Sequence, residues 1–232
     1  MRIVEVEQGS EEWHRVRSIR PTASRFHEII TPAHGKRSAQ ATKYACEIVA
    51  ARNNLSRAEM MPTPWMEWGT EMEPSAVLAY EKQFGVTLHK AGFVLPDRTD
   101  AWGCSPDRLI NLREVSDGRW ECDGGVEIKC VAPEKLILMK HEPEKHAAYS
   151  RPQIQGEAMT CSCPFWDLYM FHIELEPLWI RWEADVEYQA KIAEHLLTFH
   201  DEIKRIEASY RPMKHELVVT PTAPSELNWS DE

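Results

Sequence analysis

The 232-residue sequence lacks several features that would place it in a specialised class of protein. No apolar run approaches the roughly 20 residues that span a membrane, and the acidic N-terminus lacks the apolar core of an export signal. The six cysteines do not form a zinc ribbon, because only Cys161 and Cys163 form a close pair. Internal repeats and domain linkers are also absent. We therefore expect one main domain in the cytoplasm, with reduced thiols and no membrane partner.

Basic charge is also scarce, since the net charge is −10. This value excludes a general nucleic-acid coat protein, because phosphate binding normally requires a basic field. The charge is uneven, however: residues 1–60 contain ten Lys or Arg and seven Asp or Glu, whereas residues 61–232 contain seventeen and thirty. A nucleic-acid enzyme remains compatible with this pattern if its basic charge is local and metal ions neutralise its acids.

The order of the expected elements indicates an α/β fold with a mixed central sheet flanked by helices. Helices are expected at 11–18, 22–30, 38–53, 68–84, 133–140, 147 or 152 to 161, and 185–209. Strands are expected at 86–95, 101–112, 124–130, 165–173 and 178–184, with hairpin turns at Asp117-Gly118 and Asp123-Gly124. Residues 1–212 form the expected single domain, and residues 213–232 an acidic, flexible tail.

The strand around Glu127-Ile128-Lys129 carries the clearest chemical signal. Glu127 and Lys129 point to the same face, because side chains on a strand alternate. An exposed ion pair is the simplest interpretation of such a triplet. Asp107 changes that interpretation, because it begins the preceding apolar run and adds a second carboxylate. This combination is typical of a metal-dependent phosphodiesterase.

These carboxylates are hard oxygen ligands of the kind that Mg²⁺ or Mn²⁺ binds. Asp107, Glu127 and the backbone carbonyl of Ile128 are the expected ligands. Glu73, expected in the first turn of its helix, would add a third carboxylate and favour two ions per site. Lys129 would orient a metal-bound water or stabilise charge on the phosphate.

The N-terminal region offers a candidate anion site. Thr22 and Ser24 lie at an expected helix start, where hydroxyl and backbone N–H groups can hold a phosphate. Arg17 and Arg20 lie just before them. The alternative is a pair of capped helices with arginines facing solvent.

Several motifs together resemble the lambda exonuclease and YqaJ-type viral recombinase family, within the PD-(D/E)xK, restriction-endonuclease-like superfamily. They span about residues 8–160. In order, they are WHRVR (13–17), TAS (22–24), WGTEME (68–73), CSPD (104–107), EIKC (127–130) and QIQ (153–155). Two departures from the family pattern are Arg108 in place of the usual Gly and a longer hairpin between Asp107 and Glu127.

The resemblance implies an exonuclease that degrades one strand of linear double-stranded DNA from its 5′ end and leaves a 3′ single strand. Asp107, Glu127, Lys129 and Glu73 correspond to the catalytic and metal-binding residues. Arg17 and Ser24, with Thr22 beside them, correspond to the 5′-phosphate site, and Gln153 or Gln155 to a supporting glutamine. A homotrimeric ring, a single-strand annealing protein as partner and the cytoplasm of a bacterial host are further expectations.

Two alternatives remain open at the level of sequence. The first is a related nuclease with an iron–sulfur cluster, which requires four suitably placed cysteines. The second is a non-catalytic DNA-binding module on the same fold. The presence of Asp107, Glu127 and Lys129 together argues against the second, because only chemistry requires all three.

Overall fold

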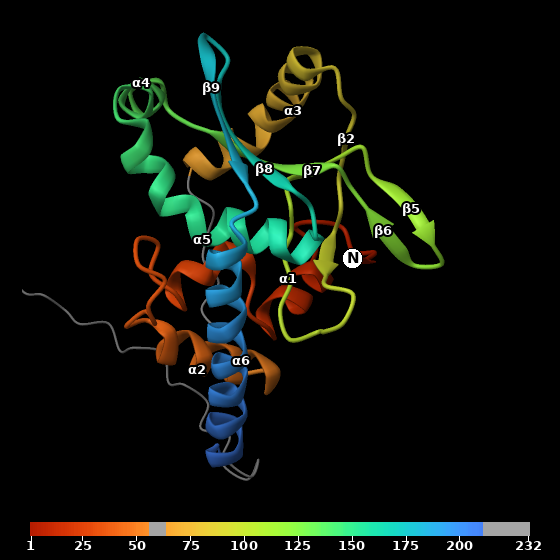
Figure 1. Cartoon of the computed structure of the whole chain (residues 1–232), viewed down its shortest axis with the longest axis vertical. Helices are drawn as coiled ribbons and strands as arrows, with labels where there is room; N and C mark the ends of the chain where they lie inside the picture. The colour runs from red at the N-terminus through yellow and green to blue at the C-terminus, as the bar shows by residue number, and fades with distance from the viewer. Residues whose placement is uncertain (56–63, 211–232) are drawn as a thin grey trace, which may run out of the picture.

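The computed structural model describes residues 1–55 and 64–210 and has a mixed five-stranded sheet at its centre (Figure 1). The strand order is β2-β4-β7-β8-β9. The strands are β2 (Leu88–His89), β4 (Arg108–Ile110), β7 (Gly124–Cys130), β8 (Phe165–His172) and β9 (Leu175–Glu183). Only the β7–β8 pair is parallel. A parallel pair requires a long crossover, which α4 (Pro133–His141) and α5 (Pro143–Cys161) provide.

Strand β8 lies between two layers of helix. Trp166 and Leu168 belong to the main core, together with side chains from α5. Tyr169 points to the other face and packs against Tyr80 of α3 (Pro64–Phe84) at a ring-centroid distance of 5.1 Å. Seven of the eight β8 residues are buried, which explains its nearly continuous apolar sequence.

The N-terminal region contains four short elements. They are β1 (Arg2–Val4), α1 (Glu11–Ser18), the 3₁₀ helix η1 (Ala23–Glu28) and α2 (Ala41–Arg52). Ser10 caps α1 by accepting a hydrogen bond from the Trp13 amide at 3.2 Å. The long helix α6 (Val186–Ser209) packs along α2, and α5 packs against η1 (Figure 1).

Several expected boundaries were wrong. The strands expected at 86–95 and 101–112 are interrupted, and β3 (Phe93–Leu95) pairs with β1 in a separate small sheet. Helix α3 begins at Pro64, so Glu73 lies in its interior and not in its first turn. Proline is well tolerated in the first turn of a helix, which explains how α3 can start at this residue. The expected tail at 213–232 lies outside the described residues.

The two expected turns also differ from each other. Asp117-Gly118 does form a hairpin turn, with Gly118 at φ +68°, between β5 (Arg113–Ser116) and β6 (Arg119–Glu121). Asp123-Gly124 does not form a hairpin turn, and Gly124 begins β7, as expected for the strand at 124–130. Added Cβ atoms would lie 2.5 Å from the Phe165 ring at Gly124 and 2.3 Å from the Trp166 ring at Gly125. The two glycines therefore allow close packing of β7 on β8, which is a different use from the expected turn.

Candidate active site

The register of β4 and β7 places two carboxylates opposite each other. Arg108 pairs with Val126, so Asp107, one residue earlier, faces Glu127. Strand β4 begins at Arg108, so Asp107 lies just before it, and the Asp107 side chain accepts a hydrogen bond from the Ile128 amide at 2.8 Å. Like charges at facing positions are destabilising unless a cation lies near them. The backbone therefore fixes an acidic pair at the end of a strand.

Lys129 supplies a cation for this pair. Its ammonium forms an ion pair with Glu127, which lies on the same face of β7 as expected. The Lys129 side chain is 44% exposed, whereas that of Glu127 is only 4% exposed. Partial burial would lower the pKa of Lys129, but the carboxylates of Glu127 and Asp107 outweigh that effect and raise it. Lys129 is therefore a persistent cation at neutral pH.

The surroundings of Asp107 change the pKa of its carboxyl group. Burial, followed by the charge of Glu127, raises its pKa to about 8, although Lys129 and the Ile128 amide oppose the rise. A cation bound between the two carboxylates would reverse this effect. The N–H and C=O of one strand residue point to the same edge, so the Ile128 carbonyl faces the side on which Asp107 lies. This donor set fits Mg²⁺ or Mn²⁺, which need only one or two carboxylates when substrate oxygens complete the shell.

Glu73 does not complete a ready-made cluster of three acids. Its carboxylate forms an ion pair with Arg108 at 2.6 Å, and both side chains are largely buried. Within residues 1–55 and 64–210, no group of three or more His, Cys, Asp or Glu side chains is arranged to hold a metal ion. Arg108 is thus paired with the Glu73 carboxylate, which the sequence analysis expected to bind a second metal ion.

One cavity of about 510 Å³ brings together most of the expected site residues. It is lined by the carboxylates of Glu73, Asp107 and Glu127 and by the cations Arg17, Lys90 and Lys129. Ser24, Gln153 and Trp13 also line it. Residues from the N-terminal region and from the central sheet therefore meet in a single space.

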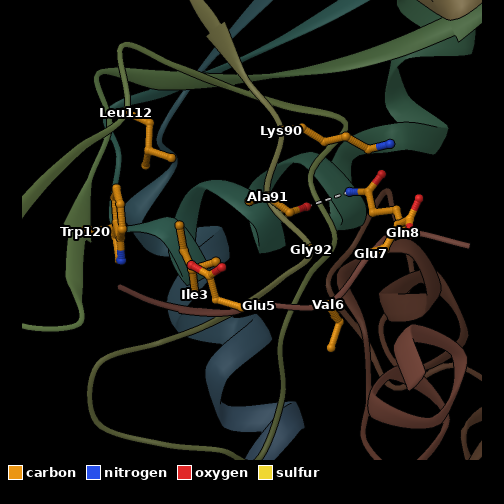
Figure 2. Close-up of a pocket in the computed structure, with 10 residues that line it drawn as sticks. All are labelled: Ile3, Glu5, Val6, Glu7, Gln8, Lys90, Ala91, Gly92, Leu112 and Trp120. Carbon is orange, nitrogen blue, oxygen red and sulfur yellow. Dashed lines mark hydrogen bonds between the residues drawn. The ribbon is translucent and has the colours of Figure 1, made fainter. Parts of the chain in front are cut away.

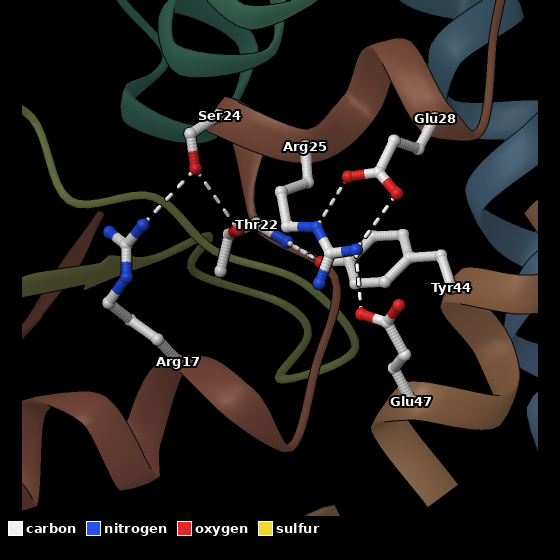
Figure 3. A network of polar contacts seen from close by, with 7 residues as sticks. All are labelled: Arg17, Thr22, Ser24, Arg25, Glu28, Tyr44 and Glu47. Carbon is white, nitrogen blue, oxygen red and sulfur yellow. Dashed lines mark hydrogen bonds and ion pairs between the residues drawn. The ribbon is translucent and has the colours of Figure 1, made fainter. Parts of the chain in front are cut away.

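The expected phosphate site occupies the N-terminal side of this cavity. The Arg17 guanidinium donates to the Ser24 hydroxyl at 3.2 Å, and Ser24 lies 3.3 Å from the Thr22 hydroxyl (Figure 3). Trp13 supports Arg17, whose guanidinium carbon lies 4.2 Å from the centroid of the indole ring. Burial lowers the pKa of Arg17, but the ordinary pKa of a guanidinium lies far above neutral pH, so Arg17 stays charged.

The backbone contributes less to this site than the sequence suggested. Residues 23–28 form a short 3₁₀ helix, and the Ala23 amide donates to the Gly103 carbonyl at 3.0 Å. The Thr22 amide donates to the Tyr44 hydroxyl at 3.1 Å, and Thr22 is only 3% exposed (Figure 3). These two backbone donors are occupied, whereas the side chains of Arg17 and Ser24 line the cavity.

The two expected glutamines have different surroundings. Gln153 lines the cavity and donates to Glu157 at 3.1 Å. Gln155 is buried elsewhere, where it bonds the backbone of Glu183 and Asp185 and so joins α5 to the start of α6. The structure thus brings Gln153, and not Gln155, into the cavity that contains Asp107 and Glu127.

Glu157 was not among the expected site residues. It is 1% exposed, and one of its carboxylate oxygens has no hydrogen-bond partner among the described residues. Burial, together with the negative charge of Glu127, raises its pKa well above the ordinary value. Its position four residues after Gln153, on the same helix face, was the sequence signal that could have identified it.

The cysteines also lie closer together than the sequence suggested. Cys104, Cys122, Cys161 and Cys163 are all buried and free. The sulfurs of Cys104 and Cys161 lie 3.8 Å apart, next to the loop that leads to Asp107. Burial raises the pKa of both thiols and so keeps them protonated.

The mixed sheet and the Asp107, Glu127 and Lys129 arrangement define a protein of the restriction-endonuclease-like fold class. Three solved structures share the fold. The alkaline exonuclease LHK-Exo from Laribacter hongkongensis has a TM-score of 0.66 and 22% identity, covering 86% of this chain and 97% of that chain. The structure of LHK-Exo in complex with dAMP has a TM-score of 0.70 and 24% identity, covering 86% of this chain and 95% of that chain. A phage-related exonuclease from Haemophilus somnus has a TM-score of 0.62 and 15% identity, covering 84% of this chain and 97% of that chain.

The chain belongs to the family of the YqaJ-like viral recombinase domain, whose model matches residues 12–163. This match confirms the family expected from the sequence motifs. No curated protein matches the sequence. None of the helices in the described part of the chain is both long and apolar enough to cross a membrane.

Proposed function

We propose that this protein is a metal-dependent exonuclease that degrades one strand of linear double-stranded DNA in the 5′→3′ direction. The observation that carries the proposal is that Arg17 and Ser24 line the same cavity as Asp107, Glu127 and Lys129. A terminal phosphate held by Arg17 and Ser24 would leave only the nearby phosphodiester bonds within reach of the carboxylates. Such a geometry favours cleavage next to a 5′ end over cleavage at internal sites.

The side chains have distinct roles in this proposal. Asp107, Glu127 and the Ile128 carbonyl would hold Mg²⁺ or Mn²⁺, with Glu73 near a second ion once Arg108 releases it. When bound, the metal would lower the pKa of a water molecule and neutralise charge on the phosphate. Lys129 would donate hydrogen bonds to the attacking water or to a phosphate oxygen.

Gln153 would present an acceptor to the reacting groups. Its amide nitrogen is committed to the Glu157 carboxylate at 3.1 Å, which leaves the amide oxygen for the cavity. That oxygen can accept a hydrogen bond from a water molecule. Glu157 would therefore act by orienting Gln153 and not by contact with DNA.

The family membership supports two further parts of the proposal. The product, a duplex with a 3′ single-stranded end, is a substrate for recombination by strand annealing, so a single-strand annealing protein is a suitable partner. A homotrimeric ring would keep the enzyme on one DNA molecule during digestion. Light scattering of the purified protein would measure the oligomeric state.

The test uses a linear duplex with a different fluorophore on the base of each 5′-terminal nucleotide and a phosphate on only one of the two 5′ ends. With Mg²⁺, mononucleotides should appear first from the phosphorylated strand, and a chelator should abolish the reaction. A closed circular duplex serves as the control and should remain intact. Release from 3′ ends, or cutting of the circle, would contradict the proposed polarity and the requirement for an end.

A further inference from the structure

Trp13 connects the two halves of the cavity. Its indole N–H donates to the Ser105 hydroxyl at 3.0 Å and to the Gly92 carbonyl at 3.1 Å. Its ring supports Arg17 from the other side, at 4.2 Å from the guanidinium carbon. Ser105 lies two residues before Asp107. One side chain therefore contacts both the proposed phosphate anchor and the loop that carries a catalytic carboxylate.

The rest of the N-terminal segment is attached to the same loops. Gln8 donates both amide hydrogens, to the Ala91 carbonyl at 2.7 Å and to the Pro106 carbonyl at 3.0 Å. Figure 2 shows the first of these bonds, beside the backbone of Gly92. A Cβ on Gly92 would lie 2.0 Å from the Val6 carbonyl oxygen, so the two segments are in backbone contact there. These contacts join the segment that precedes α1 to the loops that precede β3 and β4.

We propose that Trp13 is a positioning residue that couples recognition of the 5′-phosphate to the placement of Asp107. This inference rests on the proposed function, because it assumes that Arg17 holds the phosphate and Asp107 takes part in hydrolysis. A phosphate bound to Arg17 fixes the guanidinium over the indole ring. The indole N–H then fixes Ser105, and Ser105 orients the short segment that leads to Asp107.

Two substitutions remove the connecting hydrogen bond from opposite sides. Trp13→Phe keeps an aromatic face for Arg17 but has no N–H, and Ser105→Ala removes the acceptor. Each should reduce the preference for 5′-phosphorylated over 5′-hydroxyl duplex by about fivefold, equivalent to ~1 kcal/mol. For Trp13→Phe the reduction should appear mainly in kcat on phosphorylated ends, since Arg17, Ser24 and Ser105 all remain in the cavity.

The double variant decides whether the two residues act through one contact. If they do, Trp13→Phe with Ser105→Ala should lose no more than Trp13→Phe alone. Trp182→Phe is the matched control, because the Trp182 indole nitrogen has no hydrogen-bond partner among the described residues. It should leave the preference unchanged. Thermal unfolding of each variant would show that the fold is retained.

The outcomes separate this inference from the proposed function. A wild type that cuts no DNA, or that cuts both kinds of end equally, overturns both. A wild type that discriminates while Trp13→Phe retains the full preference overturns the coupling alone. Fully additive losses in the double variant would also overturn it, because they would mean that the two residues act independently.

Discussion

Replacement of Lys129 by Met gives the most direct test of the chemistry. The substitution keeps most of the length and volume of the side chain but removes the ammonium that pairs with Glu127. That ammonium is a preorganised donor at the edge of the cavity. Loss of one such donor typically reduces kcat by about 10²–10³, or ~3–4 kcal/mol of transition-state stabilisation. We expect a loss of this size for Lys129→Met.

Binding should change much less than turnover. Arg17 and Ser24 also line the cavity, and the hydrogen bond between them does not involve Lys129. A variant that has lost only a transition-state contact shows a lower kcat at nearly constant affinity for the substrate. Fluorescence anisotropy with a phosphorylated duplex end would measure affinity, and single-turnover digestion with excess enzyme would measure the chemical step.

The matched control is Lys204→Met, because Lys204 lies on α6 with a side chain that is 61% exposed and pairs only with a surface aspartate. It should digest DNA at the wild-type rate. A Lys129→Met rate within threefold of wild type would remove Lys129 from the mechanism. A loss of DNA binding equal to the loss of rate would instead assign Lys129 to substrate binding.

Two further predictions concern the phosphate anchor and the acidic pair. Arg17→Ala should reduce the preference for 5′-phosphorylated ends at least about tenfold, because it removes a charged donor; an unchanged ratio of rates would place the phosphate elsewhere. Asp107→Asn should raise the melting temperature of the metal-free protein more at pH 8 than at pH 5. The wild type loses stability in this range because Asp107 has a pKa of about 8 when folded and about 3.8 when unfolded, so unfolding releases its proton. Thermal unfolding in chelator would measure the difference, and equal gains at both pH values would contradict it.

The sequence predicted the acidic pair and Lys129 because their placement depends on local rules. Strand periodicity placed Glu127 and Lys129 on one face of β7. Asp107 begins the preceding apolar run, which forms β4. Antiparallel pairing of β4 with β7 aligns Asp107 with Glu127. Side-chain chemistry at these positions therefore needed no knowledge of distant contacts.

Most of the missed features depend on the three-dimensional surroundings of a residue, whereas Glu157 had a local signal in its spacing from Gln153. The pairing of Arg108 with Glu73 requires the long helix α3 to lie beside β4. Asp123-Gly124 indicated a turn in the sequence, but the role of Gly124 and Gly125 depends on two aromatic rings about 40 residues later, Phe165 and Trp166. The separation of Gln153 from Gln155 depends on the direction of each side chain around α5. Local propensity does not determine any of these.

The structure also explains how so acidic a chain could act on DNA. The cavity has three carboxylates and three cations among its described lining residues, whereas the whole chain has a net charge of −10. A metal ion at Asp107 and Glu127 would make this space positive, although the chain as a whole is acidic. Binding of the duplex body without an end would then be weak, because it depends on phosphate contacts along a basic surface. A terminal phosphate can bind in the cavity, which an internal segment of the duplex does not reach. The net acidity of the chain therefore favours binding of ends over binding of the interior of a long duplex.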